Sequence, residues 1–161
     1  MERRFEQIDL PEGIELVPNL SIAKAVELRD LGVKTSKALG IGGFLVVVDT
    51  LGMQKASEAT GGTSLNVDVA LAKIKTVLAV RQSSSLRAAR MREKGQTSED
   101  FGGRIGSLFG GGVAIFADPD HEVFVGAVAF SGGTQEQDEK ICRRTVEESG
   151  LYTDLPTPEQ Q

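Results

Sequence analysis

The chain has 161 residues, 40% of them hydrophobic and 25% charged, which is the composition of an ordinary soluble globular protein. This length supports one domain with a sizeable core and is too short for two. The net charge of −5 and the absence of tryptophan argue against nucleic-acid binding, which needs clustered basic side chains and aromatic stacking surfaces. No apolar run approaches the roughly 18 residues of a membrane span, and none resembles a signal peptide.

The sequence divides into a central domain and two weakly patterned ends. Residues 1–20 contain Pro11 and Pro18 and little periodicity, so we expect an N-terminal arm. Residues 153–161 are expected to form a flexible tail, which leaves residues 21–152 as a single domain. The one cysteine cannot form an internal disulfide, which favours a cytoplasmic location.

The first half of the domain predicts a helix, a hairpin and a second helix. Ser21 can cap a helix that ends at Gly40. The β-branched run at 43–49 is of strand length, and 53–58 is a plausible returning strand. The apolar periodicity of 65–81 predicts the second helix.

The second half begins with a short basic helix within 83–95, for which Ser83 to Ser85 offer caps. A weak strand is possible at 105–109. Two stronger strands follow at 113–117 and 122–130, joined by a turn.

Thr134 and Gln137 stand three residues apart and form a capping box for a last helix that ends near Gly150. Adjacent strands joined by short turns imply an antiparallel sheet. The pattern therefore predicts an α/β (α+β) fold, with about five antiparallel strands flanked by helices.

Two glycine-rich segments are candidate walls of a ligand-binding site. The second one follows a strand and opens a helix, whose free N–H groups could accept an anion. The alternative is structural: glycine permits positive φ and close packing, and this is the commoner role. The candidate binding residues are Gly110, Gly111 and Gly112 in the first segment, and Ser131, Gly132, Gly133 and Thr134 in the second.

Side chains suited to metal binding or nucleophilic catalysis are few. His121 is the one histidine and lies in a predicted turn, so no zinc site is expected and no metal is predicted. Cys142 is expected to be a buried small hydrophobic residue. Asp49 ends an apolar strand, where burial would raise its pKa, although a turn aspartate is more common. Lys73 can face the sheet or water, and helical lysines are usually solvated.

Together these segments resemble the GlcG/HbpS-like family, which includes the C-terminal domain of PduO-type proteins. The resemblance spans about residues 20 to 150 and is strongest at the second glycine segment. The matching residues are Val47-Val48-Asp49 with Gly52, Ala70 to Lys73 with Thr76, Arg81 with Ser83, Gly110 to Val113, Gly126 to Val128, and Ser131 to Thr134 with Asp138.

The resemblance implies a profilin-like domain that binds heme or another tetrapyrrole and assembles into homo-oligomers. PduO-type members use a histidine of the first helix as a heme ligand, and residues 21–39 contain none. Two hypotheses follow. The first is a small-ligand-binding protein, with heme as a possible cofactor. The second is a cofactor-independent lyase or isomerase for a small organic acid, with Asp49 as base and Lys73 as electrophile.

Overall fold

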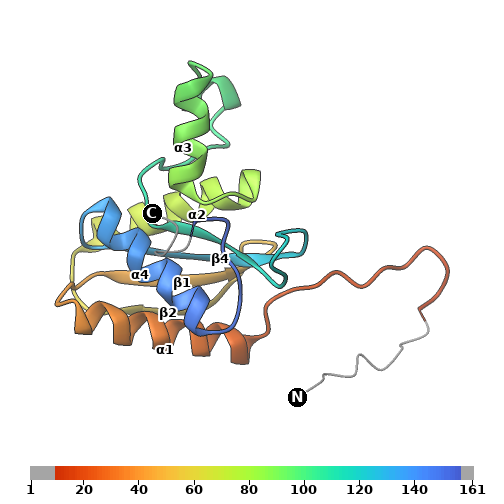
Figure 1. The fold of residues 1–161 in the computed structure, drawn as a ribbon, viewed down its shortest axis with the longest axis horizontal. Coiled ribbons are helices and arrows are strands. Elements are labelled where there is room, and N and C mark those ends of the chain that lie inside the picture. Colours follow the sequence, from red (N-terminus) through yellow and green to blue (C-terminus); the bar gives the residue numbers. More distant parts are fainter. Residues whose placement is uncertain (1–9, 157–161) are drawn as a thin grey trace.

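Helices and strands alternate in groups along the chain, and Figure 1 shows their arrangement in the computed structural model, which describes residues 10–156. The described elements are α1 (Ile22–Ala38), β1 (Phe44–Asp49), β2 (Gln54–Ala59), α2 (Ser64–Val80), α3 (Ser84–Glu93), the 3₁₀ helix η1 (Ser98–Phe101), β3 (Gly112–Phe116), β4 (Phe124–Ser131) and α4 (Gln135–Glu148).

The strands form one antiparallel sheet in the order β2-β1-β4-β3. β4 pairs with β1 from Ser131↔Phe44 to Gly126↔Asp49, and with β3 on its other side. The α/β (α+β) class with an antiparallel sheet is therefore confirmed. The expected number of about five strands is one too high for the described residues.

The expected weak strand at 105–109 is instead an irregular segment that lies against α2. The Ser107 N–H donates to Ala72 O at 3.0 Å, and Thr76 Oγ1 donates to Ser107 O at 2.8 Å. Gly106 allows this approach, because a Cβ there would clash with the Ala72 carbonyl group. Polar groups of this segment are bonded to the helix, so it does not join the sheet.

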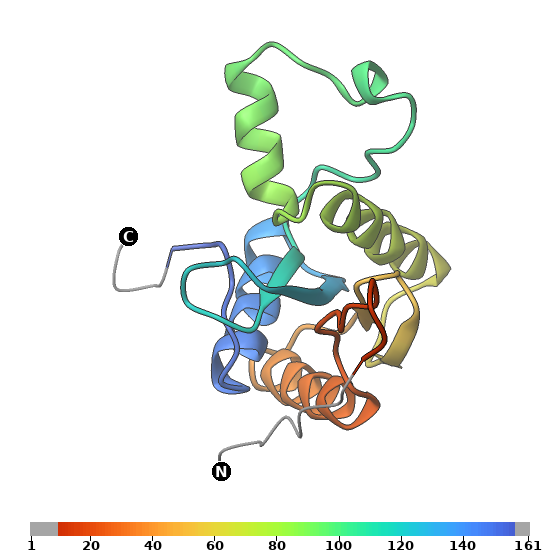
Figure 2. The ribbon, with the colours of Figure 1, turned by 90° about the vertical axis from the view of Figure 1, so that its right-hand side faces the viewer.

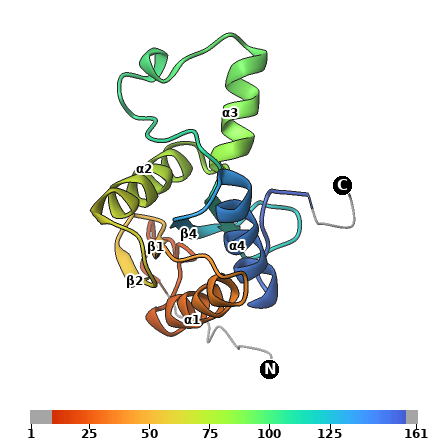
Figure 3. The same ribbon diagram turned by 90° about the vertical axis from the view of Figure 1, so that its left-hand side faces the viewer.

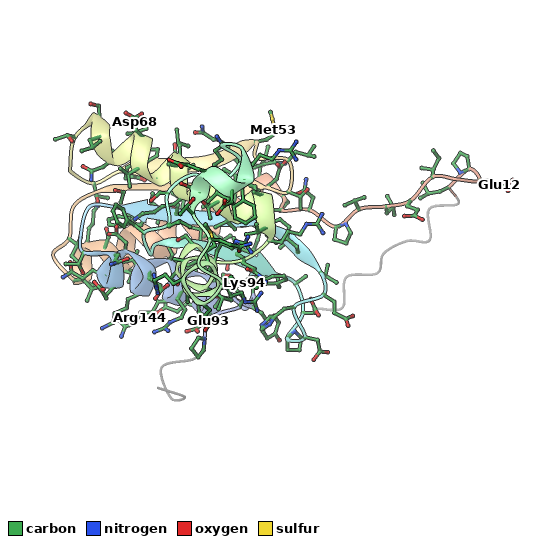
Figure 4. The ribbon with its side chains drawn as sticks, turned by 90° about the horizontal axis from the view of Figure 1, so that it is seen from above. Glu12, Met53, Asp68, Glu93, Lys94 and Arg144 are labelled. Carbon is green, nitrogen blue, oxygen red and sulfur yellow. The ribbon has the colours of Figure 1, made fainter. Side chains whose placement is uncertain are left out.

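Helices cover both faces of the sheet (Figure 3). α1 and α4 pack on one face, where Val47 and Ile141 belong to one apolar cluster. α2 packs on the other face, where Val46 belongs to a second cluster, because successive strand residues point to opposite faces. Seen from above, Asp68 on α2 and Arg144 on α4 lie on opposite sides (Figure 4).

Side chains and one loop close the free edge of β3. Its three outward N–H groups donate, in strand order, to Ser84 Oγ, Ser83 Oγ and the Tyr152 carbonyl oxygen. Ser83 occupies the N-cap position of α3, but its hydroxyl makes no capping bond. It donates to Asp154 instead. Two of the serines expected to cap a helix, Ser83 and Ser84, instead use their hydroxyls to close this strand edge.

Two segments stand away from the layered body. Residues 10–19 run outwards from α1 (Figure 1) and expose Ile14, Leu16 and Val17. α3 and the loop after it project from the sheet and its covering helices (Figure 2). In the part of the chain that the structure describes, no helix is long and apolar enough to cross a membrane.

The C-terminal end of the described chain lies against the body. Thr153 is buried, and Asp154 accepts hydrogen bonds from Ser83. Residues 157–161 of the expected tail, like residues 1–9 of the expected arm, lie outside the described residues. The proposed domain boundaries stay a prediction.

Candidate functional site

Lys73, on α2, is buried at the end of β4. Only 1% of the residue is exposed, and its Nζ donates to Phe130 O at 2.8 Å and to Asp138 Oδ2 at 2.7 Å. Of the two orientations open to Lys73, the sheet-facing one is correct, and the commoner solvated one is wrong. A buried charge needs such partners, because an unpaired ammonium group in the interior is very costly.

Gly111 and Gly112 leave room for this ion pair. A Cβ on Gly111 would lie 2.5 Å from Asp138 Cβ and 2.8 Å from Lys73 Nζ, and one on Gly112 would lie 2.9 Å from Lys73 Cβ. Gly111 also has a φ of +110°, which disfavours other residues. The first glycine segment therefore has the packing role that we considered more common. Its contact with a ligand stays a prediction.

The turn between β4 and α4 uses several of its N–H groups within the chain. The Gly133 N–H donates to Asp138 Oδ1 at 2.8 Å. The Thr134 N–H donates to Gln137 Oε1 at 2.9 Å, and the Gln137 N–H donates to Thr134 Oγ1 at 3.3 Å, which confirms the capping box. Gly132 is packed tightly against the backbone before β1. The anion that lies at this turn is thus the protein's own Asp138 carboxylate.

A pocket of ≈ 270 Å³ opens beside the ion pair, between α2, the loop before β3 and the start of α4. Lysine has three N–H donors, and the chain bonds two of those of Lys73. The Ser131 hydroxyl accepts from Asn66 Nδ2 at 3.3 Å, which leaves its own hydrogen to donate. Phe109, 64% exposed, is at the pocket's outer wall. The lining residues are Val69, Lys73, Phe109, Ser131, Gly133, Gln135 and Asp138.

Sequence reasoning identified four of these residues and missed three. Lys73, Ser131 and Gly133 were candidates, and Asp138 entered only as a residue of the family resemblance. Val69 carried a signal, since it stands one helical turn before Lys73 and shares its face. Phe109 and Gln135 carried none, because their position depends on how the loop folds over α2.

Asp49 lies far from this pocket. It pairs with Gly126 in the sheet, whereas Lys73 bonds Phe130, four residues further along β4. At roughly 3.4 Å per residue, this is a separation of about 14 Å. The structure therefore does not bring together the base and electrophile of the lyase or isomerase hypothesis, which is not favoured.

The environment of Asp49 stabilises its charged form. Burial opposes ionisation, but hydrogen bonds from the Met53 and Leu51 N–H groups, a bond from Asn19 and the Lys55 ammonium outweigh it. Together they hold the pKa of Asp49 below its ordinary value. The expectation of a raised pKa is wrong, and the turn-aspartate alternative is correct.

The pocket does not offer a strong iron ligand among its lining residues. His121 is exposed in its turn, and Cys142 is fully buried, where its Sγ contacts Gly111 O at 3.4 Å. Burial raises the pKa of the Cys142 thiol, so it is not a thiolate. Within residues 10–156, no group of three or more histidine, cysteine, aspartate or glutamate side chains could hold a metal ion.

The fold and this sequence pattern define a known family. The family model described as "Haem degrading protein HbpS-like" matches residues 20–147. The chain therefore belongs to the HbpS-like family. No curated protein matches it in sequence.

Solved structures share the fold at low sequence identity. A crystal structure of a PduOC–heme complex has a TM-score of 0.72 and 20% identity, over 85% of this chain and 99% of that one. A double mutant of Streptomyces reticuli HbpS has a TM-score of 0.74 and 17% identity, over 88% and 94%. The Klebsiella pneumoniae protein ORFY has a TM-score of 0.74 and 22% identity, over 91% and 99%.

Proposed function

We propose that this protein binds a small organic carboxylate in the pocket beside Lys73 and Asp138, here called the Lys73 pocket. A tetrapyrrole such as heme is the leading candidate ligand. The observation that carries the proposal is the buried Lys73, which lines the pocket and whose amine has one N–H donor that residues 10–156 do not bond. The Ser131 hydroxyl, which accepts from Asn66 and has its own hydrogen left to donate, adds a donor on the same side. Such charge-assisted bonds suit a carboxylate oxygen.

The size of the pocket limits how a tetrapyrrole would bind. Pockets that enclose drug-sized ligands have volumes of roughly 300–1,000 Å³, and this one has ≈ 270 Å³. A propionate group would enter, and the macrocycle would lie outside against Phe109. None of the lining residues suits iron, so the proposed binding depends on the propionates and on ring contacts.

The heme assignment is supported by relatives. The matching family is described as haem degrading, and one structure of the same fold is that of a heme complex. Both statements concern other proteins, and the low identity transfers the fold alone.

The proposal is tested by an absorbance titration with hemin and with hemin dimethyl ester, in which both propionates are blocked. Hemin should shift the Soret band saturably, and the ester should bind at least about tenfold more weakly, since a charge-assisted bond is worth about 1.5–3 kcal/mol. Equal affinity for both would contradict the proposal.

Two variants localise the binding. Ser131→Ala should cost little stability but weaken hemin binding, and Phe109→Ala should weaken it through lost ring contact. Leu51→Ala is the matched control for Phe109→Ala. Leu51 is also an exposed apolar side chain (83%), but it follows Asp49 in the chain and does not line the pocket. If the Leu51 variant loses as much affinity as the Phe109 variant, the ligand does not bind at this pocket.

We also propose a homo-oligomer. The apolar strand β4 does not itself call for a partner, because it is central in the sheet and its residues are all buried. The support that remains is the family resemblance and the exposed Ile14, Leu16 and Val17 of the arm. Sedimentation should detect a species larger than a monomer at micromolar concentration, and a monomer alone would contradict this.

A further inference from the structure

A second pocket, of ≈ 320 Å³, lies at the other end of the β3–β4 pair. Its floor is a row of four side chains. The Arg81 guanidinium lies 5.5 Å from the centre of the Phe124 ring. The Phe124 and Phe116 rings meet edge to face, with their centres 5.8 Å apart. The centres of the Phe116 and His121 rings are 5.2 Å apart. Phe116 and Phe124 are partners in the sheet, so the sheet holds this row in place. Gln82, Leu86, Arg90, Glu122 and Asp154 complete the lining of this pocket, here called the arginine pocket.

Backbone strain is concentrated at the same place. Arg81 has a φ of +52° and His121 a φ of +60°, and in residues 10–156 they are the only non-glycine residues with positive φ. Arg81 ends α2 in the left-handed conformation, where glycine is the usual residue because it has no Cβ. Strained residues tend to gather at binding and catalytic sites. Both strained residues line the arginine pocket.

The two arginines have no carboxylate partner in the described structure. None of the ion pairs within 4 Å that the described residues form involves Arg81 or Arg90. Asp154 lines the same pocket, but its two oxygens accept from the Ser83 N–H and hydroxyl. Burial raises the pKa of Asp154, against the effect of those bonds. Glu122 is exposed in the turn beside His121.

We propose that the arginine pocket binds a small organic carboxylate with a flat apolar body, at a site separate from the Lys73 pocket. A guanidinium group binds a carboxylate through two parallel N–H bonds, and within residues 10–156 neither Arg81 nor Arg90 uses its donors in an ion pair. The body of the ligand packs on the apolar part of the lining, which Leu86, Phe116 and Phe124 form. This site does not depend on the function proposed for the Lys73 pocket.

Benzoate is the probe, and benzyl alcohol is its uncharged counterpart with the same ring. In a ¹H–¹⁵N NMR titration of the full chain, benzoate at millimolar concentration should shift the amide signals of Arg81, Phe116 and Phe124 saturably. Benzyl alcohol should shift them little. No saturable shift with benzoate, or equal shifts with the alcohol, overturns the proposal. Inorganic phosphate that binds these amides as tightly as benzoate overturns it as well, because the apolar body would then contribute nothing.

Variants separate the guanidinium groups from the fold. Arg81→Gly and Arg90→Ala should each weaken benzoate binding about tenfold or more, since each removes a charge-assisted bond. Glycine suits the left-handed position of Arg81, so the melting temperature of Arg81→Gly should not fall. Arg92→Ala is the matched control, because Arg92 is exposed on α3 and does not line the pocket. Wild-type affinity in both Arg81→Gly and Arg90→Ala refutes the site.

Discussion

Replacing Lys73 by methionine tests the central feature of the Lys73 pocket. Methionine keeps much of the length of the side chain and removes its charge. Asp138 would then keep only its bond from the Gly133 N–H, and Phe130 O would lose its donor at 2.8 Å. Removing one partner of a buried ion pair costs about 3–5 kcal/mol, because the other charge stays buried and uncompensated. We expect Lys73→Met to lower the free energy of unfolding by that amount.

Urea denaturation followed by circular dichroism measures the change. The control is Lys75→Met, which makes the same substitution at an exposed position of α2. It should change the free energy of unfolding by less than about 0.5 kcal/mol. A domain of this kind has a total stability of about 5–15 kcal/mol, so the Lys73 variant should remain measurable, with its transition at lower urea.

The double variant Lys73→Met with Asp138→Leu isolates the pair. If the two side chains stabilise each other, the double variant should be more stable than the sum of the two single losses predicts, by about 0.5–3 kcal/mol. The reasoning is refuted if Lys73→Met resembles Lys75→Met, or if the two single losses simply add. Either result would mean that the ion pair at 2.7 Å does not contribute as its burial implies.

Three further predictions use other parts of the chain. Thr134→Ala should lower the free energy of unfolding by about 1 kcal/mol, since it removes the cap of α4, and urea denaturation measures it; an unchanged midpoint would contradict this. The low pKa of Asp49 means that its charged form stabilises the fold above the unfolded-state pKa and that this stabilisation is lost as the pH falls through the folded-state pKa. The stability difference between wild type and Asp49→Asn should therefore shrink on acidification below about pH 4, and a constant difference would refute it. Hemin should bind weakly, with a spectrum that His121→Ala changes little, whereas a sharp low-spin spectrum that His121→Ala abolishes would contradict the proposed mode.

Most of the fold could be predicted because its signals are local. The β-branched run of β1 indicated a strand, and Thr134 with Gln137 indicated the start of α4. The segment at 105–109 was the error, because its outcome depends on contacts with α2 that are distant in sequence. The closing of the β3 edge by Ser83 and Ser84 was not predictable for the same reason.

The candidate site was predictable in its parts and not in its assembly. The glycines were visible in the sequence, but what they accommodate was not, because Lys73 and Asp138 stand far apart in the chain. Asp49 shows the opposite error. Burial alone suggested a raised pKa, whereas the turn that follows it supplies two N–H donors and reverses the direction. Hydrogen bonds from the backbone are set by the turn geometry, which composition does not describe.

The two proposed pockets are placed by the same two elements. β4 is buried along its whole length, so it meets a pocket only at its ends, near Ser131 and near Phe124. α2 contributes a cation to each pocket, Lys73 within the helix and Arg81 at its C-terminal cap. Eight residues of α-helix separate them by about 12 Å along the axis. Because one packed helix and its cap carry both residues, the spacing of their backbones is set before any ligand binds, and such preorganisation favours binding. The selectivity of each site should then depend on its more exposed wall, Phe109 in one case and the α3 side chain Arg90 in the other.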